Sequence, residues 1–367
     1  MLEGRCTNVF VFGAGASYDA GADLSVPLTS QLLSEAITLY ALDLINDSAC
    51  FRQSFEKIRP FSDSLDGPGI VARPKPNCSN GRHTMPDELE QLVARIKEQR
   101  DDDLERALWY VLYTTISDAS VPNSRIYRPG PQGNLIMERE SNYAQLVKLL
   151  PKDELNAFIS FNYDLLLDHA VHRRESGVGN YNLPFAYQIG FDGYQRVIDG
   201  NTGPADWDIL KPHGSFNWGH CSSCRIHVLF SYLDPSGLAS QKCRNCHRGL
   251  TPVLVSPVQG TQIPPDTTPV WDRAAHLLAN ADRLIVVGYS FPQADARALT
   301  LFHSSLANNG ALQSVVIADP CPNEIQCRLE ELAGETIRRA TTRRFRGFTE
   351  FVRALTMCRG EAADALN

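Results

Sequence analysis

The stretch TNVFVFGAGAS, residues 7–17, decides the fold class of this chain. Its first six residues are rich in β-branched and aromatic side chains, and a turn of small residues, Gly13-Ala14-Gly15-Ala16-Ser17, follows directly. A buried strand, a glycine-rich turn and a helix start are the usual opening of a doubly wound α/β domain. The stretch therefore predicts a Rossmann-like core built on a parallel sheet.

Further apolar runs extend this sheet. Those at 155–161, 253–255, 284–288 and 314–318 have the length and composition of buried parallel strands. Residues 294–307 predict a helix that carries its apolar side chains on one face. We expect a Rossmann-like, doubly wound parallel sheet from three segments and a C-terminal helix and tail. The three segments are 1–28, 151–218 and 251–345, and the tail is 346–367.

Residues 29–150 have a different pattern and predict a helical insertion. Apolar residues recur at helical spacing within 32–40, 89–96 and 104–112. Two stretches rich in Pro, Gly, Ser and Asn, at 59–86 and 121–141, predict loops. The insertion is expected between the first and second strands of the sheet.

The composition narrows the classes of function. The 367 residues are 43% hydrophobic and 21% charged, as in ordinary globular proteins. A formal net charge of −7 makes nucleic acid an unlikely partner, because proteins that neutralise phosphates are usually basic. No run approaches the roughly 20 apolar residues of a membrane helix, and the apolar start is too short for a secretory leader. We therefore expect a cytoplasmic protein with no membrane partner.

Four of the ten cysteines form two tight pairs separated by eighteen residues. They are Cys221, Cys224, Cys243 and Cys246. Each pair places two thiolates on one tight turn, and four sulfurs satisfy tetrahedral Zn²⁺ without leaving an open coordination position. We therefore predict a structural zinc ribbon at 219–250, with the nearby histidines as bystanders. The other cysteines are scattered, which favours a reducing cytoplasm over a disulfide framework.

Polar or glycine-rich turns follow four predicted strands, at 13–17, 160–164, 211–215 and 288–291. Because open α/β sheets bind ligands outside the carboxyl ends of their strands, these turns are expected to converge on one crevice. Each turn also has a purely structural explanation. Asn162 and Asp164 can cap a helix, His213 can be a hydrogen-bonded core histidine, and the glycines can serve tight turns or close packing.

The order of these turns, together with the cysteine ribbon, resembles the sirtuin superfamily over residues 9–319. The resemblance implies a Rossmann-like domain that binds NAD⁺, a small zinc module and roles for single residues. Asn162 would hold the ribose hydroxyls or a water, Asp164 would bind the nicotinamide carboxamide, and His213 would be the base acting on a ribose hydroxyl. The other implied NAD-binding positions are Gly13, Ala14, Gly15, Ser17, Gly288, Ser290 and Asp319.

Two departures concern the parts of deacylating sirtuins that handle an acylated peptide. Where those enzymes have Pro-Asp-Phe-Arg, this chain has Asp-Leu-Ser-Val at 23–26. Where they have Phe-Gly-Glu, it has Ser-Pro-Val at 256–258, and proline cannot donate to a pairing edge. The chain thus resembles bacterial sirtuin-like proteins that cleave NAD⁺ outright, often as antiviral defence effectors.

The expected activity is hydrolysis of NAD⁺ to nicotinamide and ADP-ribose, with the linear or cyclic form of the product left open. A first alternative is an NAD-dependent protein-lysine deacylase that uses the same residues. A second is an NAD-binding sensor or assembly module with little turnover. The resemblance also implies a homo-oligomer and activation by a partner protein or a phage trigger.

Overall fold

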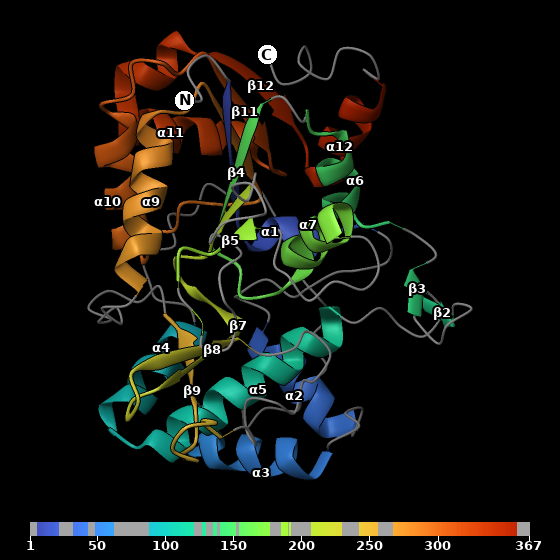
Figure 1. Cartoon of the computed structure of the whole chain (residues 1–367), viewed down its shortest axis with the longest axis vertical. Helices are drawn as coiled ribbons and strands as arrows, with labels where there is room; N and C mark the ends of the chain where they lie inside the picture. Colours follow the sequence, from blue (N-terminus) through green and yellow to red (C-terminus); the bar gives the residue numbers. More distant parts are fainter. Residues whose placement is uncertain are drawn as a thin grey trace.

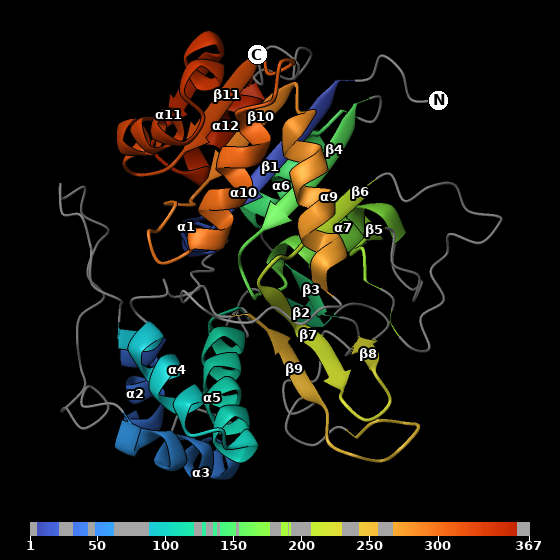
Figure 2. The same cartoon turned by 90° about the vertical axis from the view of Figure 1, so that its left-hand side faces the viewer.

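The computed structural model describes residues 6–21, 32–42, 48–61, 88–120, 127–129, 135–137, 140–151, 154–176, 185–189, 191, 207–229, 242–255 and 267–357. These residues form a large sheet covered by helices, a separate cluster of helices and a small sheet (Figure 1, Figure 2).

The large sheet has seven strands, all parallel, in the order β12-β11-β10-β1-β4-β6-β5. The strands are β1 (Thr7–Phe12), β4 (Leu155–Ser160), β5 (Phe185–Ala186), β6 (Trp207–Leu210), β10 (Arg283–Val287), β11 (Ser314–Ala318) and β12 (Thr341–Phe345). In the central strand β1, Phe12 pairs with Ser160 on one side and Val287 on the other. The parallel α/β sheet predicted from residues 7–17 is confirmed.

Helices cover both faces of this sheet, as the two views show (Figure 1, Figure 2). One face carries α9 (Thr268–Ala279), α10 (Ala296–Leu306) and α11 (Pro322–Arg339), and the other carries α6 (Asn142–Leu149), α7 (Leu166–Ser176) and α12 (Phe348–Met357). Phe12 contacts the rings of Tyr143 and Phe348 at centroid distances of 5.2 and 5.9 Å. The sheet is therefore doubly wound and buried on both faces.

Most predicted strands match the structure, and one lies in a different sheet. The strand predicted at 253–255 forms β9 (Thr251–Leu254), but it pairs with β7 (Gly214–Cys221) and not with the Rossmann-like sheet. Strand β12 was not predicted. Its sequence Thr-Thr-Arg-Arg-Phe has no apolar run, because it is an edge strand with mostly exposed side chains.

The segment predicted as a helical insertion contains α2 (Leu32–Leu42), α3 (Ser48–Ile58), α4 (Glu88–Glu98) and α5 (Asp102–Ser120). These helices pack together below the large sheet (Figure 2). Their shared core includes Phe55, Ile96 and Leu108, all fully buried. Helix α6, at the end of the same segment, instead covers the large sheet.

Two stretches predicted as loops have some regular structure. A short 3₁₀ helix, η2 (Arg59–Phe61), begins the first stretch, and residues 62–87 lie outside the described residues. In the second, β2 (Tyr127–Pro129) pairs antiparallel with β3 (Leu135–Met137). The departures noted at 23–26 and 256–258 also lie outside the described residues.

Strand β7 is the centre of the small antiparallel sheet, between β8 (Ile226–Leu229) and β9. It begins directly after His213 and ends at Cys221. Gly214 has a φ of +83°, and a Cβ at this position would meet the Val253 carbonyl oxygen at 1.9 Å. Glycine is therefore required for β9 to approach β7 at this point.

Among the described residues, no helix is both long enough and apolar enough to cross a membrane. Of the scattered cysteines, Cys6 and Cys327 carry free thiols, whereas Cys321 is disulfide-bonded. The disulfide differs from the expectation that the scattered cysteines are all reduced.

Candidate functional site

The residues predicted to bind or cleave NAD⁺ all follow strands of the large sheet, at its carboxyl edge. Because the sheet is parallel, the turns after β1, β4, β6, β10 and β11 lie along one edge. Strand β1 is the switch point of the topology, with β4 on one side and β10 on the other. Open α/β sheets bind ligands in the crevice at such a point.

The glycines after β1 pack against the glycine after β10. The Gly13 and Gly15 N–H groups donate to the carbonyls of Val287 and Gly288 at 3.1 and 3.0 Å. A Cβ on Gly288, whose φ is +59°, would meet the Ala16 nitrogen at 2.2 Å. These glycines therefore allow two turns to approach closely, which is the structural explanation that the sequence left open. The Ala14 N–H has no partner among the described residues.

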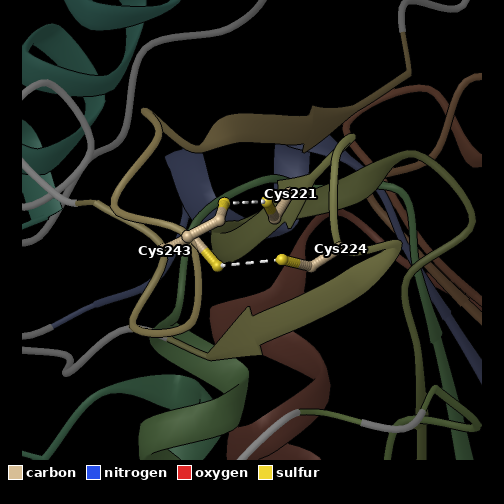
Figure 3. A group of neighbouring side chains, drawn as sticks. Cys221, Cys224 and Cys243 are labelled. Carbon is tan, nitrogen blue, oxygen red and sulfur yellow. Dashed lines mark hydrogen bonds between the residues drawn. The ribbon is translucent and has the colours of Figure 1, made fainter.

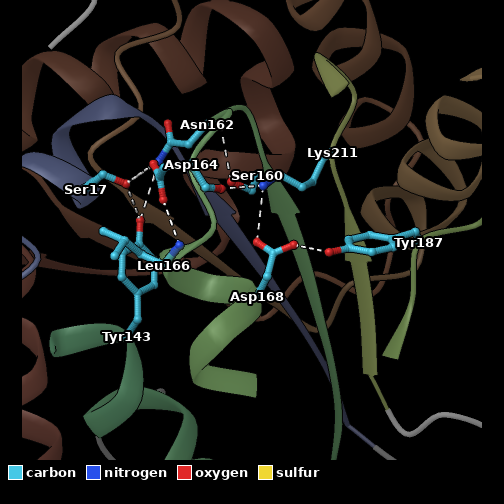
Figure 4. A network of polar contacts seen from close by, with 9 residues as sticks. All are labelled: Ser17, Tyr143, Ser160, Asn162, Asp164, Leu166, Asp168, Tyr187 and Lys211. Carbon is cyan, nitrogen blue, oxygen red and sulfur yellow. Dashed lines mark hydrogen bonds and ion pairs between the residues drawn. The ribbon is translucent and has the colours of Figure 1, made fainter. Parts of the chain in front are cut away.

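A buried network joins the turns after β1 and β4 to α6 (Figure 4). Ser17 Oγ, on the short helix α1 (Ala14–Tyr18), donates to Asp164 Oδ2 at 2.7 Å and lies 3.0 Å from the Tyr143 hydroxyl. Asn162 Nδ2 donates to the Gly13 carbonyl at 2.8 Å and to Ser17 Oγ at 2.9 Å. The structure thus brings Ser17, Asn162 and Asp164 together as the sequence suggested.

Asp164 is a buried carboxyl group whose environment disfavours its charged form. Burial raises the pKa of Asp164, while the Lys211 ammonium and the hydrogen bonds from Ser17 and the Leu166 N–H act in the opposite direction. Ionisable groups with perturbed pKa values concentrate at functional sites, although structural networks also perturb pKa values. The helix-capping explanation also has support, because Asp164 Oδ1 accepts a hydrogen bond from the N–H of Leu166, the first residue of α7.

Lys211 supports the turn that carries Asp164 (Figure 4). Its side chain is fully buried, and its ammonium donates to the Asp164 carbonyl oxygen and lies 3.2 Å from Asp168 Oδ2. The Tyr187 hydroxyl donates to the other oxygen of Asp168. These contacts join β6 to the segment that follows β4.

His213 follows β6 and is also buried. Its Nε2 lies 3.1 Å from Asp295 Oδ2, and its ring contacts the Phe161 ring at a centroid distance of 5.0 Å. Phe161 is the residue directly before Asn162, so His213 lies beside the turn that carries the buried network. His213 is therefore a buried histidine beside a carboxylate, as the structural explanation expects, and it also adjoins the turn that carries Asn162, as a functional role requires.

Two other predicted residues lie at the same edge but outside this network. Ser290 is exposed, and its carbonyl oxygen accepts a hydrogen bond from Arg328. Asp319 follows β11 and accepts from the Cys321 N–H at 2.8 Å, and burial raises the pKa of its carboxyl group. Among the described residues, neither Ser290 nor Asp319 is hydrogen-bonded to Asn162 or Asp164.

The structure brings the four paired cysteines together, and Figure 3 shows three of them, Cys221, Cys224 and Cys243. All four sulfurs lie within 4.8 Å of one another, with Cys221 and Cys246 at 3.4 Å and Cys224 and Cys243 at 3.8 Å. A tetrahedron with Zn–S bonds of about 2.3 Å has edges of roughly 3.8 Å. The cluster therefore fits a structural zinc site, and the neighbouring histidines do not belong to it.

Both cysteine pairs adopt the same local conformation. The Arg225 N–H donates to the Cys221 carbonyl at 2.7 Å, and the His247 N–H donates to the Cys243 carbonyl at 2.8 Å. Arg225 and His247 have positive φ values of 55° and 57°. Each pair thus forms a closed turn that directs two sulfurs to the same point.

Several residues of the site were not predicted. Tyr143, Asp168 and Tyr187 reach the buried groups only through the packing of α6, α7 and the segment after β5. Lys211 and Asp295 lie within or beside the predicted turns, but no role was assigned to them. A lysine two residues before a candidate base, at the end of a buried strand, was the one available signal.

No protein-family model matches this chain, and no curated protein matches it. Solved structures of Sir2 proteins are similar to it at a remote level. Sir2 with a p53 peptide and NAD⁺ has a TM-score of 0.42 at 16% identity, covering 98% of this chain and 95% of that one. Sir2Tm bound to a propionylated peptide has a TM-score of 0.40, with the same identity and coverage.

Proposed function

We propose that this chain is an enzyme that binds NAD⁺ at the carboxyl edge of its large sheet and cleaves the bond between nicotinamide and ribose. The observation that carries the proposal is the convergence of Asn162, Asp164 and His213 at this edge, in buried turns after neighbouring strands. A carboxamide, a carboxyl and an imidazole are the group types that such a cleavage needs for binding, orientation and proton transfer.

The free hydrogen-bonding atoms of this set fit a ribosyl ligand. Asn162 Oδ1 and His213 Nδ1 accept no hydrogen bond from the described residues. Ribose hydroxyls and water offer O–H donors to both atoms. Each oxygen of Asp164 accepts one hydrogen bond and can accept another, which suits the amide N–H of nicotinamide.

In the proposed reaction, Asp164 binds the carboxamide, Asn162 orients the ribose or the attacking water, and His213 accepts a proton. The C–N bond to nicotinamide breaks, a C–O bond to water forms, and one proton is released with ADP-ribose and nicotinamide. The remaining contacts to the dinucleotide fall to residues of the turns after β1, β10 and β11. They are Gly13, Ala14, Gly15, Ser17, Gly288, Ser290 and Asp319.

The proposal also names water as the group that accepts the ADP-ribosyl unit. It rests on the sequence at 23–26 and 256–258, which departs from the segments that handle acyl-lysine in deacylating sirtuins. With an acyl-lysine peptide as acceptor, the same three residues would instead serve a deacylase.

One experiment separates these activities. Purified protein, loaded with zinc, is incubated with NAD⁺ with and without an acetyl-lysine peptide, and released nicotinamide is measured. Release without peptide supports the hydrolase, and release only with peptide supports the deacylase. No release, also after addition of a candidate activator, supports a sensor and contradicts the proposed cleavage.

Matched variants test the assignment of residues. We expect His213→Ala and Asn162→Ala each to abolish nicotinamide release while the fold persists. His276→Ala serves as the control, because His276 is an exposed histidine on α9. Full activity in His213→Ala would show that the assigned base is wrong.

We also propose that the chain acts as a bacterial antiphage effector that depletes NAD⁺, as a homo-oligomer under the control of a partner or phage trigger. The resemblance given by the sequence supports this role. Cells expressing the protein should lose NAD⁺ and restrict phage growth, and His213→Ala should remove both effects. Phage restriction without loss of NAD⁺ would contradict this role.

A further inference from the structure

We infer that Asp295 is a positioning residue that holds the imidazole of His213 in one tautomer, with the proton on Nε2 and the accepting lone pair on Nδ1. The functional part of this inference rests on the proposed role of His213 as a base. The tautomer itself can be measured in a protein that turns nothing over, so the two proposals can fail separately.

The contacts of Asp295 fix its carboxylate on several sides. Oδ2 lies 3.1 Å from His213 Nε2 and accepts a hydrogen bond from the Tyr289 hydroxyl at 2.9 Å. Oδ1 accepts from the Ala298 N–H at 3.3 Å, so the same side chain caps the N-terminus of α10. The N-terminus of α10 and the Tyr289 hydroxyl therefore fix the position of the Asp295 carboxylate independently of the imidazole.

A carboxylate held in this way determines which ring nitrogen carries the proton. An ionised carboxylate only accepts hydrogen bonds, so its position 3.1 Å from Nε2 favours the neutral tautomer that carries the proton on that nitrogen. The other nitrogen, Nδ1, then keeps its lone pair. Nδ1 has no partner among the described residues and is not one of the unpartnered polar atoms that are shielded from solvent.

Tyr289 keeps the second hydrogen bond to Asp295 in place. Burial, followed by the nearby Asp295 charge, raises the pKa of Tyr289 well above its ordinary value. The phenol therefore stays protonated and donates across the neutral range. Its ring also stacks on Phe161 at a centroid distance of 4.4 Å, which holds the hydroxyl over the same pair.

Three aromatic rings flank the imidazole of His213. The rings of Phe161, Trp271 and Tyr163 lie at centroid distances of 5.0, 6.2 and 6.4 Å. They restrict rotation of the imidazole without offering a competing acceptor to Nε2. Asp295 is thus the group that sets the orientation and the tautomer.

The test is NMR of the full-length protein labelled with ¹⁵N-histidine, recorded at alkaline pH, where imidazoles are neutral. His213→Gln assigns the His213 signals. We expect a protonated Nε2 and an unprotonated Nδ1 in the wild type, and a loss or reversal of this pattern in Asp295→Asn. Asparagine caps helices well, so this variant keeps the start of α10. Tyr289→Phe leaves the carboxylate in place and should retain the wild-type pattern.

Kinetics give a second readout if the wild type releases nicotinamide. Asp295→Asn should lower kcat at least tenfold with little change in KM, since general-base catalysis typically contributes roughly 10²- to 10⁴-fold. Asp295→Glu should restore part of the loss. The inference is overturned if wild-type His213 carries its proton on Nδ1 or on both nitrogens, or if Asp295→Asn leaves the tautomer unchanged.

Discussion

Replacing Lys211 by methionine tests whether the buried ion pair beneath the site holds the Asp164 turn in place. Methionine has a similar length but no charge. Lys211 and Asp168 are both fully buried, with 3.2 Å between Nζ and Oδ2. Removing one partner of a buried pair typically costs 3–5 kcal/mol, because the other charge is left uncompensated. The Asp164 carbonyl also loses its donor, so we expect a loss of about 4 kcal/mol or more in the free energy of unfolding.

A double-mutant cycle separates the pair from general packing effects. Lys211→Met and Asp168→Asn should each be strongly destabilising, while the double variant should be more stable than the sum predicts by about 2 kcal/mol, since coupled buried groups deviate from additivity by roughly 0.5–3 kcal/mol. Urea denaturation followed by circular dichroism measures all four proteins. Lys148→Met is the control, because its ion pair with Glu140 is exposed and is expected to contribute less than about 1 kcal/mol.

If the effects of the two single variants add within about 0.5 kcal/mol, which is the behaviour of independent sites, Lys211 and Asp168 are not coupled. If Lys211→Met destabilises no more than Lys148→Met, the buried pair does not hold the Asp164 turn in place. If the pair positions the site, nicotinamide release by Lys211→Met should fall even where the protein remains folded.

The remaining predictions concern metal, pH and backbone. Cys243→Ser should lose bound zinc and lower the melting temperature, because structural zinc contributes directly to folding; metal analysis showing a full zinc content would contradict this. Burial raises the pKa of Asp164 above its ordinary value of 3.8, so its ionisation costs stability as the pH rises above that value. Asp164→Asn should therefore be more stable than the wild type at neutral pH, with the difference shrinking on acidification, and inactive. Melting curves across pH would exclude this if the wild type were the more stable at neutral pH. Gly288→Ala should destabilise by about 1–3 kcal/mol or more, because φ is +59° and the new Cβ meets the Ala16 nitrogen at 2.2 Å; an unchanged denaturation midpoint would contradict it.

Much of the large sheet could be predicted from the sequence, because its central strands are continuous apolar runs followed by turns. Residues 7–17 alone define β1 and the turn after it. The cysteine cluster could be predicted equally well, because the spacing of its cysteines along the sequence reflects the geometry of a bound metal. Strand β12 was not, because an exposed edge strand needs no apolar pattern.

The site could be predicted only where its residues follow strands directly. Asn162, Asp164 and His213 do, and the parallel topology then places them along one edge. Tyr143 does not, since it comes from a helix far away in the sequence and reaches Ser17 only through the packing of α6. For Gly13, Gly15 and Gly288, the sequence could not separate close packing from phosphate binding, and the contacts between the two turns now account for these glycines.

Strand β7 gives the molecule a mechanical connection between two chemically unrelated centres. It begins beside the imidazole of His213 and ends at a metal-binding sulfur, Cys221, a span of roughly 23 Å for a strand of this length. Near its start, Phe216 contacts Tyr113 of α5 at a ring-centroid distance of 5.0 Å. A shift of the helical cluster or a change at the cysteine cluster would therefore displace the end of the same strand that adjoins His213.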